Sequence, residues 1–166
     1  MVEITKVYDQ DMGSVRFIGK KYTNADRVDG LFSHLWTQWF DNDWFQVIDD
    51  VSVDEDFNFE DELGQIGMIR GEGENFEYWI GLFTPPNTVI PEGYESIDFA
   101  SGKIGVCWVY GDPEDVYMME GKCAEKLIEA GYDLAPICFE RYTCPRFTEP
   151  DEDNRVILDV GFFLAS

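Results

Sequence analysis

Two short segments of this chain resemble each other across a separation of 80 residues. Trp79–Phe83 reads W-I-G-L-F and Asp159–Phe163 reads D-V-G-F-F, with glycine at the same place in both. An internal repeat constrains the fold strongly, because each copy must form the same kind of unit. We therefore expect the same order of elements before each of the two segments.

The first half of the chain carries the signals of a strand, a helix and further strands. β-branched and aromatic residues predict a strand over 14–19, and a turn at Thr23 and Asn24 precedes a helix predicted over 25–40. Its apolar residues follow the spacing of one helix face: Val28, Leu31, Phe32, Leu35, Trp36, Trp39 and Phe40. A less distinct strand follows over about 64–70.

The second half repeats this order. A strand is predicted over 103–110, Asp112 is expected to cap a helix that starts at Pro113, and Gly131 ends that helix. The helix carries an apolar stripe: Val116, Met119, Cys123, Leu127 and Ile128. Two more strands are predicted, over 137–143 and 156–164. This pattern predicts an α+β fold in which two β-α-β-β pseudo-repeats form a mainly antiparallel sheet with helices on one face.

We expect residues 1–166 to form a single domain. Repeat one covers about 1–86 and repeat two about 94–166, with a proline-containing surface linker between them. Eight of the fourteen residues over 49–62 are acidic, which indicates an acidic insertion at about 49–63. It is expected to be a solvated loop or a lid.

Charge is the unusual part of the composition. Thirty-four acidic residues against 12 basic ones give a net charge of −22, so binding of nucleic acid by a basic face is excluded. Attraction of cations, or of a basic protein partner, is permitted. The chain shows no secretory signal and no membrane span, and its four cysteines form no C-x-x-C motif. We therefore expect a cytoplasmic protein with free thiols and no contact with a membrane.

Motifs for metals and cofactors are absent or incomplete. Asp54-x-Asp56-x-Asn58 begins like a calcium loop, but Phe59 and Gln65 occupy the places that need glycine and glutamate. His34 is the only histidine, which leaves no nucleophilic triad and no histidine-rich zinc site, and no phosphate-binding glycine loop occurs. No metal and no cofactor are predicted.

A carboxylate on a predicted strand is the main candidate for chemistry. Alternation over 137–142 places Cys138, Glu140 and Tyr142 on one face, which indicates a half-buried Glu140. Burial raises the pKa of a carboxyl group or demands a cationic partner. Two alternatives remain open: a salt bridge to a lysine or arginine, or a counter-charge at the floor of an aromatic pocket.

Aromatic residues could form such a pocket. Trp108 and Tyr110 share one face of their strand, and further walls could come from Trp36, Trp39, Tyr78 and Trp79. Aromatic faces with one carboxylate suit flat, apolar, cationic ligands. Packing in the core is the alternative role for each of these side chains.

Several motifs resemble those of the GyrI-like effector-binding domains. Ile90–Tyr94 and Ile97–Val106 are similar to that family's "P-E-G…P-A-G-x-Y-A-V". Gly131–Leu134 with Cys138–Tyr142 resembles "G-Y-x-L…F-E-x-Y", and Leu158–Leu164 resembles the closing "I-E-I-x-I-P-V" strand. The chain departs from the family at Asp159, where a glutamate is usual, and at Phe163, where a proline is usual.

The resemblance implies two β-α-β-β repeats with a cleft between them that binds small, often lipophilic or cationic compounds. It gives Glu140, the glutamate of F-E-x-Y, a place in the pocket. The family includes sensing domains of transcription regulators, stand-alone gyrase-inhibitor-like proteins and hydrolases of cyclopropane-bearing genotoxins. Because no DNA-binding region is evident, a stand-alone domain is expected.

Three functions follow as hypotheses. The first is binding or sequestration of lipophilic, aromatic, cationic compounds. The second is hydrolysis of cyclopropanoid or related electrophiles, with Glu140 as general base and Tyr142 as its hydroxyl partner. The third is a protein-interaction module whose acidic surface engages a basic partner such as a topoisomerase.

Overall fold

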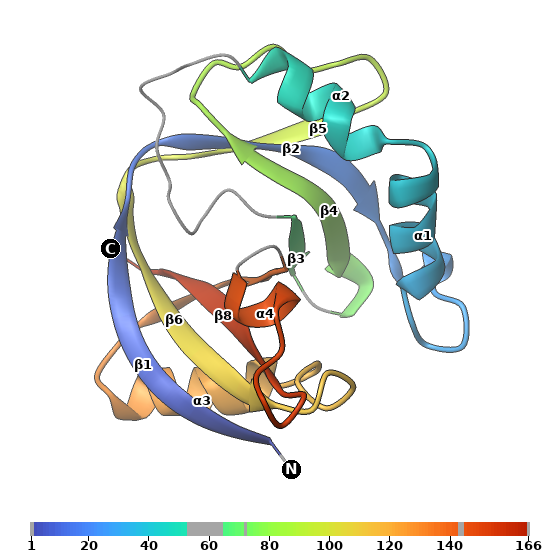
Figure 1. Ribbon diagram of the computed structural model, residues 1–166. Coiled ribbons are helices and arrows are strands. Elements are labelled where there is room, and N and C mark those ends of the chain that lie inside the picture. The colour runs from blue at the N-terminus through green and yellow to red at the C-terminus, as the bar shows by residue number, and fades with distance from the viewer. Residues whose placement is uncertain (1, 53–64, 72, 143–144, 166) are drawn as a thin grey trace. The chain divides into compact units, whose positions relative to one another are not determined.

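The computed structural model describes residues 2–52, 65–71, 73–142 and 145–165. The chain divides into two compact units, one formed by residues 14–100 and the other by residues 1–13 together with 101–166 (Figure 1). Each unit contributes four strands, and every strand pair within a unit is antiparallel.

The unit of residues 14–100 holds four strands in the order β3-β4-β2-β5. They are β2 (Val15–Tyr22), β3 (Ile66–Arg70), β4 (Glu77–Thr84) and β5 (Glu95–Phe99). The helices are α1 (Ser33–Asp41) and α2 (Trp44–Val51), with short 3-10 turns η1 (Asn24–Asp26) and η2 (Gly73–Asn75).

The unit of residues 1–13 and 101–166 holds four strands in the order β1-β6-β8-β7. They are β1 (Val2–Met12), β6 (Gly102–Gly111), β7 (Leu134–Arg141) and β8 (Val156–Leu164). The helices are α3 (Glu120–Glu129) and the one-turn α4 (Pro145–Thr148).

The two units share one topology, which confirms the predicted pair of repeats and the α+β class. In each unit the chain runs from a strand through helix to two further strands, as β2, β3 and β4 or as β6, β7 and β8. The last of these three strands lies between the other two in the sheet. The two similar sequence segments are the equivalent strands β4 and β8. The strand extents predicted over 103–110 and 156–164 are confirmed to within one residue.

A fourth strand completes each sheet in a way that the repeat pattern did not predict. β1 precedes β2 in the chain but pairs with β6, and β5 precedes β6 but pairs with β2. Each unit thus takes its fourth strand from the residues just before the other repeat.

The helix predicted over 25–40 is wrong in its first half. Asp29 and Gly30 adopt positive φ angles of 54° and 78°, which a helix cannot contain, and Val28 pairs with Leu31 in an isolated bridge. Val28 and Leu31 are therefore about half exposed instead of lying on a buried helix face. α1 begins only at Ser33.

The acidic loop predicted from about residue 49 is also wrong at its start, because residues 49–51 belong to α2 (Trp44–Val51). Phe45 and Ile48 face the core from this helix. The rest of the acidic insertion, residues 53–63, lies outside the described residues.

The second helix starts later than Asp112 and Pro113 predict. Residues 113–118 form turns and bends, and Met118 has a positive φ of 62°, so α3 begins at Glu120. Cys123 and Leu127 form its buried side, whereas Ile128 is exposed. Gly131, with a φ of 99°, follows the end of this helix as predicted.

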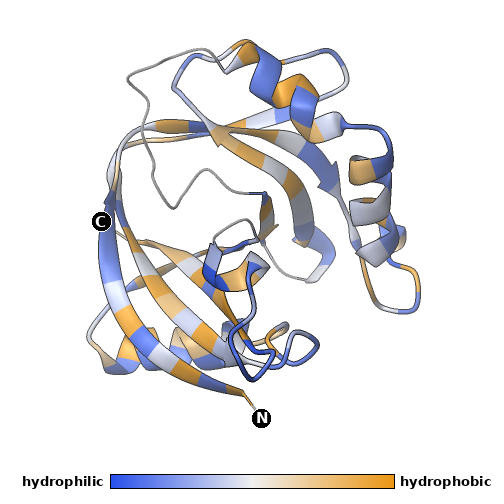
Figure 2. Cartoon of the chain, in the orientation of Figure 1, coloured by the Kyte–Doolittle hydropathy of each residue, from blue (hydrophilic) through white to orange (hydrophobic). Residues whose placement is uncertain are grey.

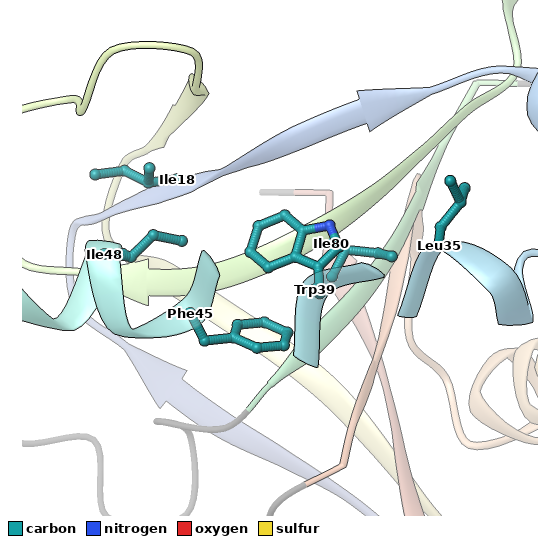
Figure 3. Packing of buried hydrophobic residues seen from close by; sticks show 6 residues of the cluster. All are labelled: Ile18, Leu35, Trp39, Phe45, Ile48 and Ile80. Carbon is teal, nitrogen blue, oxygen red and sulfur yellow. The ribbon is translucent and has the colours of Figure 1, made fainter. Parts of the chain in front are cut away.

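Alternating hydropathy along the strands gives each sheet two different faces (Figure 2). In the unit of residues 14–100, α1 and α2 pack on one of them. The core there is a cluster in which the indole of Trp39 lies beside Phe45, at 4.6 Å between ring centroids (Figure 3). Its members are Ile18, Leu35, Trp39, Phe45, Ile48 and Ile80.

In the part of the chain that the structure describes, no helix is both long and apolar enough to cross a lipid bilayer. The cytoplasmic location remains a prediction.

Candidate functional site

Glu140 lies on the face of its sheet that α3 covers. Both Glu140 of β7 and Cys107 of β6 pair with Val160 of β8, so the three side chains share one face. The Cys107 thiol reaches the backbone oxygen of Cys123 in α3, at 3.6 Å. Glu140 therefore lies on the sheet face that α3 packs against, and its side chain is partly buried.

Two polar groups contact the Glu140 carboxyl. The hydroxyl of Tyr142 donates a hydrogen bond of 2.9 Å to Oε2 of Glu140. The carboxyl of Glu120, the first residue of α3, lies near enough for its negative charge to act on the Glu140 carboxyl. The predicted proximity of Glu140 and Tyr142 is thus observed.

Three aromatic rings gather beside this carboxyl group, and we call them the aromatic triangle: Tyr117, Tyr142 and Phe147. Their centroids lie 6.2 Å (Tyr117 to Tyr142), 5.5 Å (Tyr142 to Phe147) and 6.4 Å (Tyr117 to Phe147) apart. Tyr117 is 42% exposed, and the other two rings are partly exposed. The triangle therefore offers aromatic surface to solvent next to an enclosed carboxyl group.

The electrostatics at Glu140 are those of a carboxyl group without a counter-cation. Burial, followed by the negative charge of Glu120, raises the pKa of Glu140 to about 8, and the hydrogen bond from Tyr142 opposes the rise. Burial and then the charge of Glu140 also raise the pKa of Tyr117, which keeps that phenol neutral. Among the described residues, no lysine or arginine forms an ion pair with Glu140, so the salt-bridge alternative is not the one observed.

The neighbouring arginine is directed elsewhere. Arg141, 1% exposed, donates from Nε and Nη2 to Oδ2 of the fully buried Asp159, at 3.0 and 2.5 Å. Arg146 of α4 also donates to Asp159, with its Nε 2.7 Å from Oδ1. Asp159 pairs with Arg141 in β7 and Trp108 in β6, which places this charged centre on the sheet face opposite Glu140.

Trp108 and Tyr110 lie on that opposite face, so the structure does not bring them together with Glu140. Lys6 and Arg146 lie 4.5 and 4.8 Å from the Trp108 ring, and the indole donates to the hydroxyl of Tyr8 at 3.2 Å. The Tyr110 hydroxyl bonds to Oδ2 of Asp151 at 2.5 Å. Both rings therefore have partners within the chain.

The other four predicted aromatic residues belong to the unit of residues 14–100. Trp39 and Trp79 are buried, which agrees with the core alternative for these two. Trp36 donates from its indole N–H to the hydroxyl of Tyr78 at 2.9 Å, and both are partly buried. A role of these residues in ligand binding remains a prediction.

Cys138, the cysteine two residues before Glu140, does not supply a nucleophile. Cys107, Cys123 and Cys138 are free and buried, in agreement with the expected free thiols, and Cys144 lies outside the described residues. Burial, then the charges of Glu120 and Glu140, raises the pKa of Cys138 to about 12. Its thiol therefore stays protonated near neutral pH.

The site also contains no set of metal ligands among the described residues. No group of three His, Cys, Asp or Glu side chains there could hold a metal ion.

Sequence reasoning missed Glu120, Tyr117 and Phe147. The helix was predicted to start at Pro113, which put Tyr117 in its first turns and Glu120 in its middle. The positive φ of Met118 resets the helix start and brings Glu120 to the Glu140 carboxyl. No periodic signal marks Phe147, which lies in the one-turn α4.

The fold recurs among solved structures. A Staphylococcus aureus MU50 protein, named for a role in bacterial transcription regulation, is 20% identical with a TM-score of 0.62, and the match covers 97% of this chain and 99% of that one. SAV2435, solved bound to tetraphenylphosphonium, is 20% identical with a TM-score of 0.65, over 98% and 95%. EcmrR, solved in a complex with DNA, is 8% identical with a TM-score of 0.62, over 97% of this chain and 57% of EcmrR.

No family model and no curated protein matches the chain. The likeness to the solved structures establishes the fold. It confirms, at that level, the resemblance to the GyrI-like effector-binding domains that the sequence motifs indicate.

Proposed function

We propose that this protein binds small lipophilic cations with aromatic bodies, at Glu140 and the aromatic triangle. One observation carries the proposal: among the described residues, the Glu140 carboxyl has no cationic partner, and a tyrosine hydroxyl, a second carboxyl and aromatic rings lie around it. A bound cation would supply the positive charge that the chain does not place there.

The chemistry of the neighbours favours an organic cation over a metal ion. Aromatic faces attract cations through the ring quadrupole and also cover apolar surface. The triangle combines both properties with the carboxyl groups of Glu120 and Glu140 beside it. A hydrated metal ion would gain little from three rings, whereas a cation with aryl substituents would contact rings and carboxyl together.

The comparisons support the same class of ligand. SAV2435, which shares the fold, was solved bound to tetraphenylphosphonium, a cation with four aromatic rings. The resemblance to the GyrI-like domains also gives the glutamate of F-E-x-Y, here Glu140, a place in the ligand pocket. The identity of the natural ligand is a separate question from its class.

The test is a calorimetric titration with tetraphenylphosphonium. We expect binding in the micromolar range, weakened about tenfold or more in Glu140→Gln, because the amide keeps the shape but loses the charge. Glu125→Gln is the matched control, since it removes the same charge from an exposed position of α3. Equal affinity of the two variants would contradict the proposed site.

The hydrolase hypothesis uses the same side chain. A carboxyl with a pKa of about 8 beside a tyrosine hydroxyl can give or accept a proton near neutral pH. Turnover of an electrophilic substrate, lost in Glu140→Gln while binding persists, would distinguish catalysis from binding.

A further inference from the structure

Lys20 of β2 lies in an aromatic cage within the unit of residues 14–100. Its Nζ is 4.6 Å from the centroid of the Trp44 ring and 4.5 Å from the centroid of the Tyr94 ring. The same Nζ donates a hydrogen bond of 3.1 Å to the backbone oxygen of Gly93. We call these two rings and this carbonyl the ammonium cage. Ring faces together with a hydrogen-bond acceptor are the groups that recognise an alkylammonium ion.

The walls of the ammonium cage are held by contacts that do not involve Lys20. The Tyr94 hydroxyl donates a hydrogen bond of 2.9 Å to the backbone oxygen of Trp44. The buried ring of Trp39 packs edge-on against both walls, with its centroid 5.7 Å from Trp44 and 6.0 Å from Tyr94. The Gly93 carbonyl belongs to a turn that is closed by the backbone N–H of Tyr94. The cage should therefore keep its shape when Lys20 leaves it.

Lys20 itself is held only by the contacts of the cage. No carboxylate of the described residues forms an ion pair with it, although the chain contains 34 acidic residues. Its side chain is partly exposed, and burial lowers the pKa of its ammonium group. Fixing a lysine side chain in one conformation also costs rotamer entropy. Lys20 can therefore leave the cage by rotation of its side chain, without a movement of β2.

We propose that the ammonium cage is a second cation site, which binds small alkylammonium ions and which Lys20 occupies while no ligand is bound. Lys20 then competes with the ligand. The rings attract a cation of this size, and methyl groups on the ligand nitrogen would add apolar contact with them. The net charge of −22 favours the arrival of cations. The inference is independent of the proposed function, because the cage and Glu140 belong to different units.

The test is a titration with n-propylammonium chloride, followed by NMR at the indole N–H of Trp44 and the amide N–H of Tyr94. Lys20→Ala removes the part of the side chain that n-propylammonium replaces. We expect saturable shifts in this variant, with a dissociation constant in the millimolar range. Binding by the unmodified protein should be about tenfold weaker or more, because Lys20 competes for the cage. Sodium chloride at the same concentrations controls for ionic strength.

Two variants serve as controls. Lys21→Ala removes the same charge from the adjacent, exposed position of β2, on the other face of the sheet, and should bind like the unmodified protein. Lys20→Met keeps the cage filled with an uncharged side chain, and it should not bind at a concentration that saturates Lys20→Ala. A Lys20→Ala variant that binds no more tightly than the unmodified protein would overturn the inference.

A measurement on the unmodified protein tests the competition without any substitution. Ring currents of Trp44 and Tyr94 should place the Hε signals of Lys20 upfield of those of Lys21. Saturation with tetramethylammonium should return them to the ordinary lysine position, whereas tert-butanol, which is similar in size but neutral, should not. Lys20 signals that stay unchanged in tetramethylammonium would overturn the competition. Binding of tetraphenylphosphonium at Glu140 is measured separately, so its failure would leave the ammonium cage standing.

Discussion

Glu140 and Asp159 lie on neighbouring strands and on opposite faces of one sheet; Asp159 is fully buried and Glu140 is partly buried. Asp159 is surrounded by the guanidinium groups of Arg141 and Arg146. Glu140 instead has a pKa raised to about 8 and accepts a hydrogen bond from Tyr142. These are the two ways in which a protein can accommodate a buried carboxyl group, and only the second leaves a place for a cationic ligand.

The ion pairs of Asp159 with Arg141 and Arg146 should stabilise the fold. Asp159→Asn would leave Arg141 fully buried beside a neutral amide, and we expect a loss of about 3–5 kcal/mol in the free energy of unfolding. Asp98→Asn breaks the exposed pair with Arg16, and the expected loss is much smaller because solvent screens that pair. Urea unfolding measures both. A loss at Asp159 as small as that at Asp98 would contradict this account of the centre.

For single residues, the sequence predicts which side chains share a face of one strand, because side chains alternate along a strand. Glu140 and Tyr142 are two residues apart in β7 and the residue after it, and the period of two placed them together. Trp108 and Glu140 belong to different strands, so their faces depend on register, which composition and spacing do not reveal. The place of Glu120 near the site could not be predicted either, because it depends on the residue at which α3 starts.

The glycine shared by the two similar segments has a physical cause in β4. A Cβ on Gly81 would lie 2.1 Å from the backbone oxygen of Ile18 in the paired strand. In β8, a Cβ on Gly161 would lie 2.5 Å from the ring of Phe139. Each strand thus depends on the close approach that glycine permits.

Gly81→Ala should therefore destabilise the protein, by about 1–3 kcal/mol, because backbone atoms must move to admit the methyl group. Gly121→Ala in α3 is the matched control. It has nothing within 4 Å of its Cβ position and lies in a helix, so we expect a gain of about 0.5–1 kcal/mol. Thermal or urea unfolding compares the two, and a neutral Gly81→Ala would show that the strands relax freely.

Strands were easier to predict than helices, for reasons visible in particular elements. β8 was found with its observed bounds because a run of polar residues, 151–155, precedes a mainly apolar run. α1 and α3 begin later than predicted, since Asp29 and Met118 adopt left-handed backbone that no residue pattern announced. The partners of β1 and β5 could not be predicted, because periodicity identifies a strand without identifying its neighbour.

For the whole molecule, a net charge of −22 has a consequence for cationic ligands. A negative field raises the rate at which cations arrive and is screened by salt, whereas contacts at an enclosed carboxyl are screened much less. An acidic surface also suits a basic protein partner, and that role remains a prediction. The contribution of residues 53–63 lies outside the described residues.

The central claim is that Glu140 and the aromatic triangle form the ligand site. The most direct measurement is a crystal structure of the complex with tetraphenylphosphonium. The account predicts the cation with its phenyl groups against Tyr117, Tyr142 and Phe147, and its charge facing Glu140. A well-defined cation that contacts none of these residues would contradict the account.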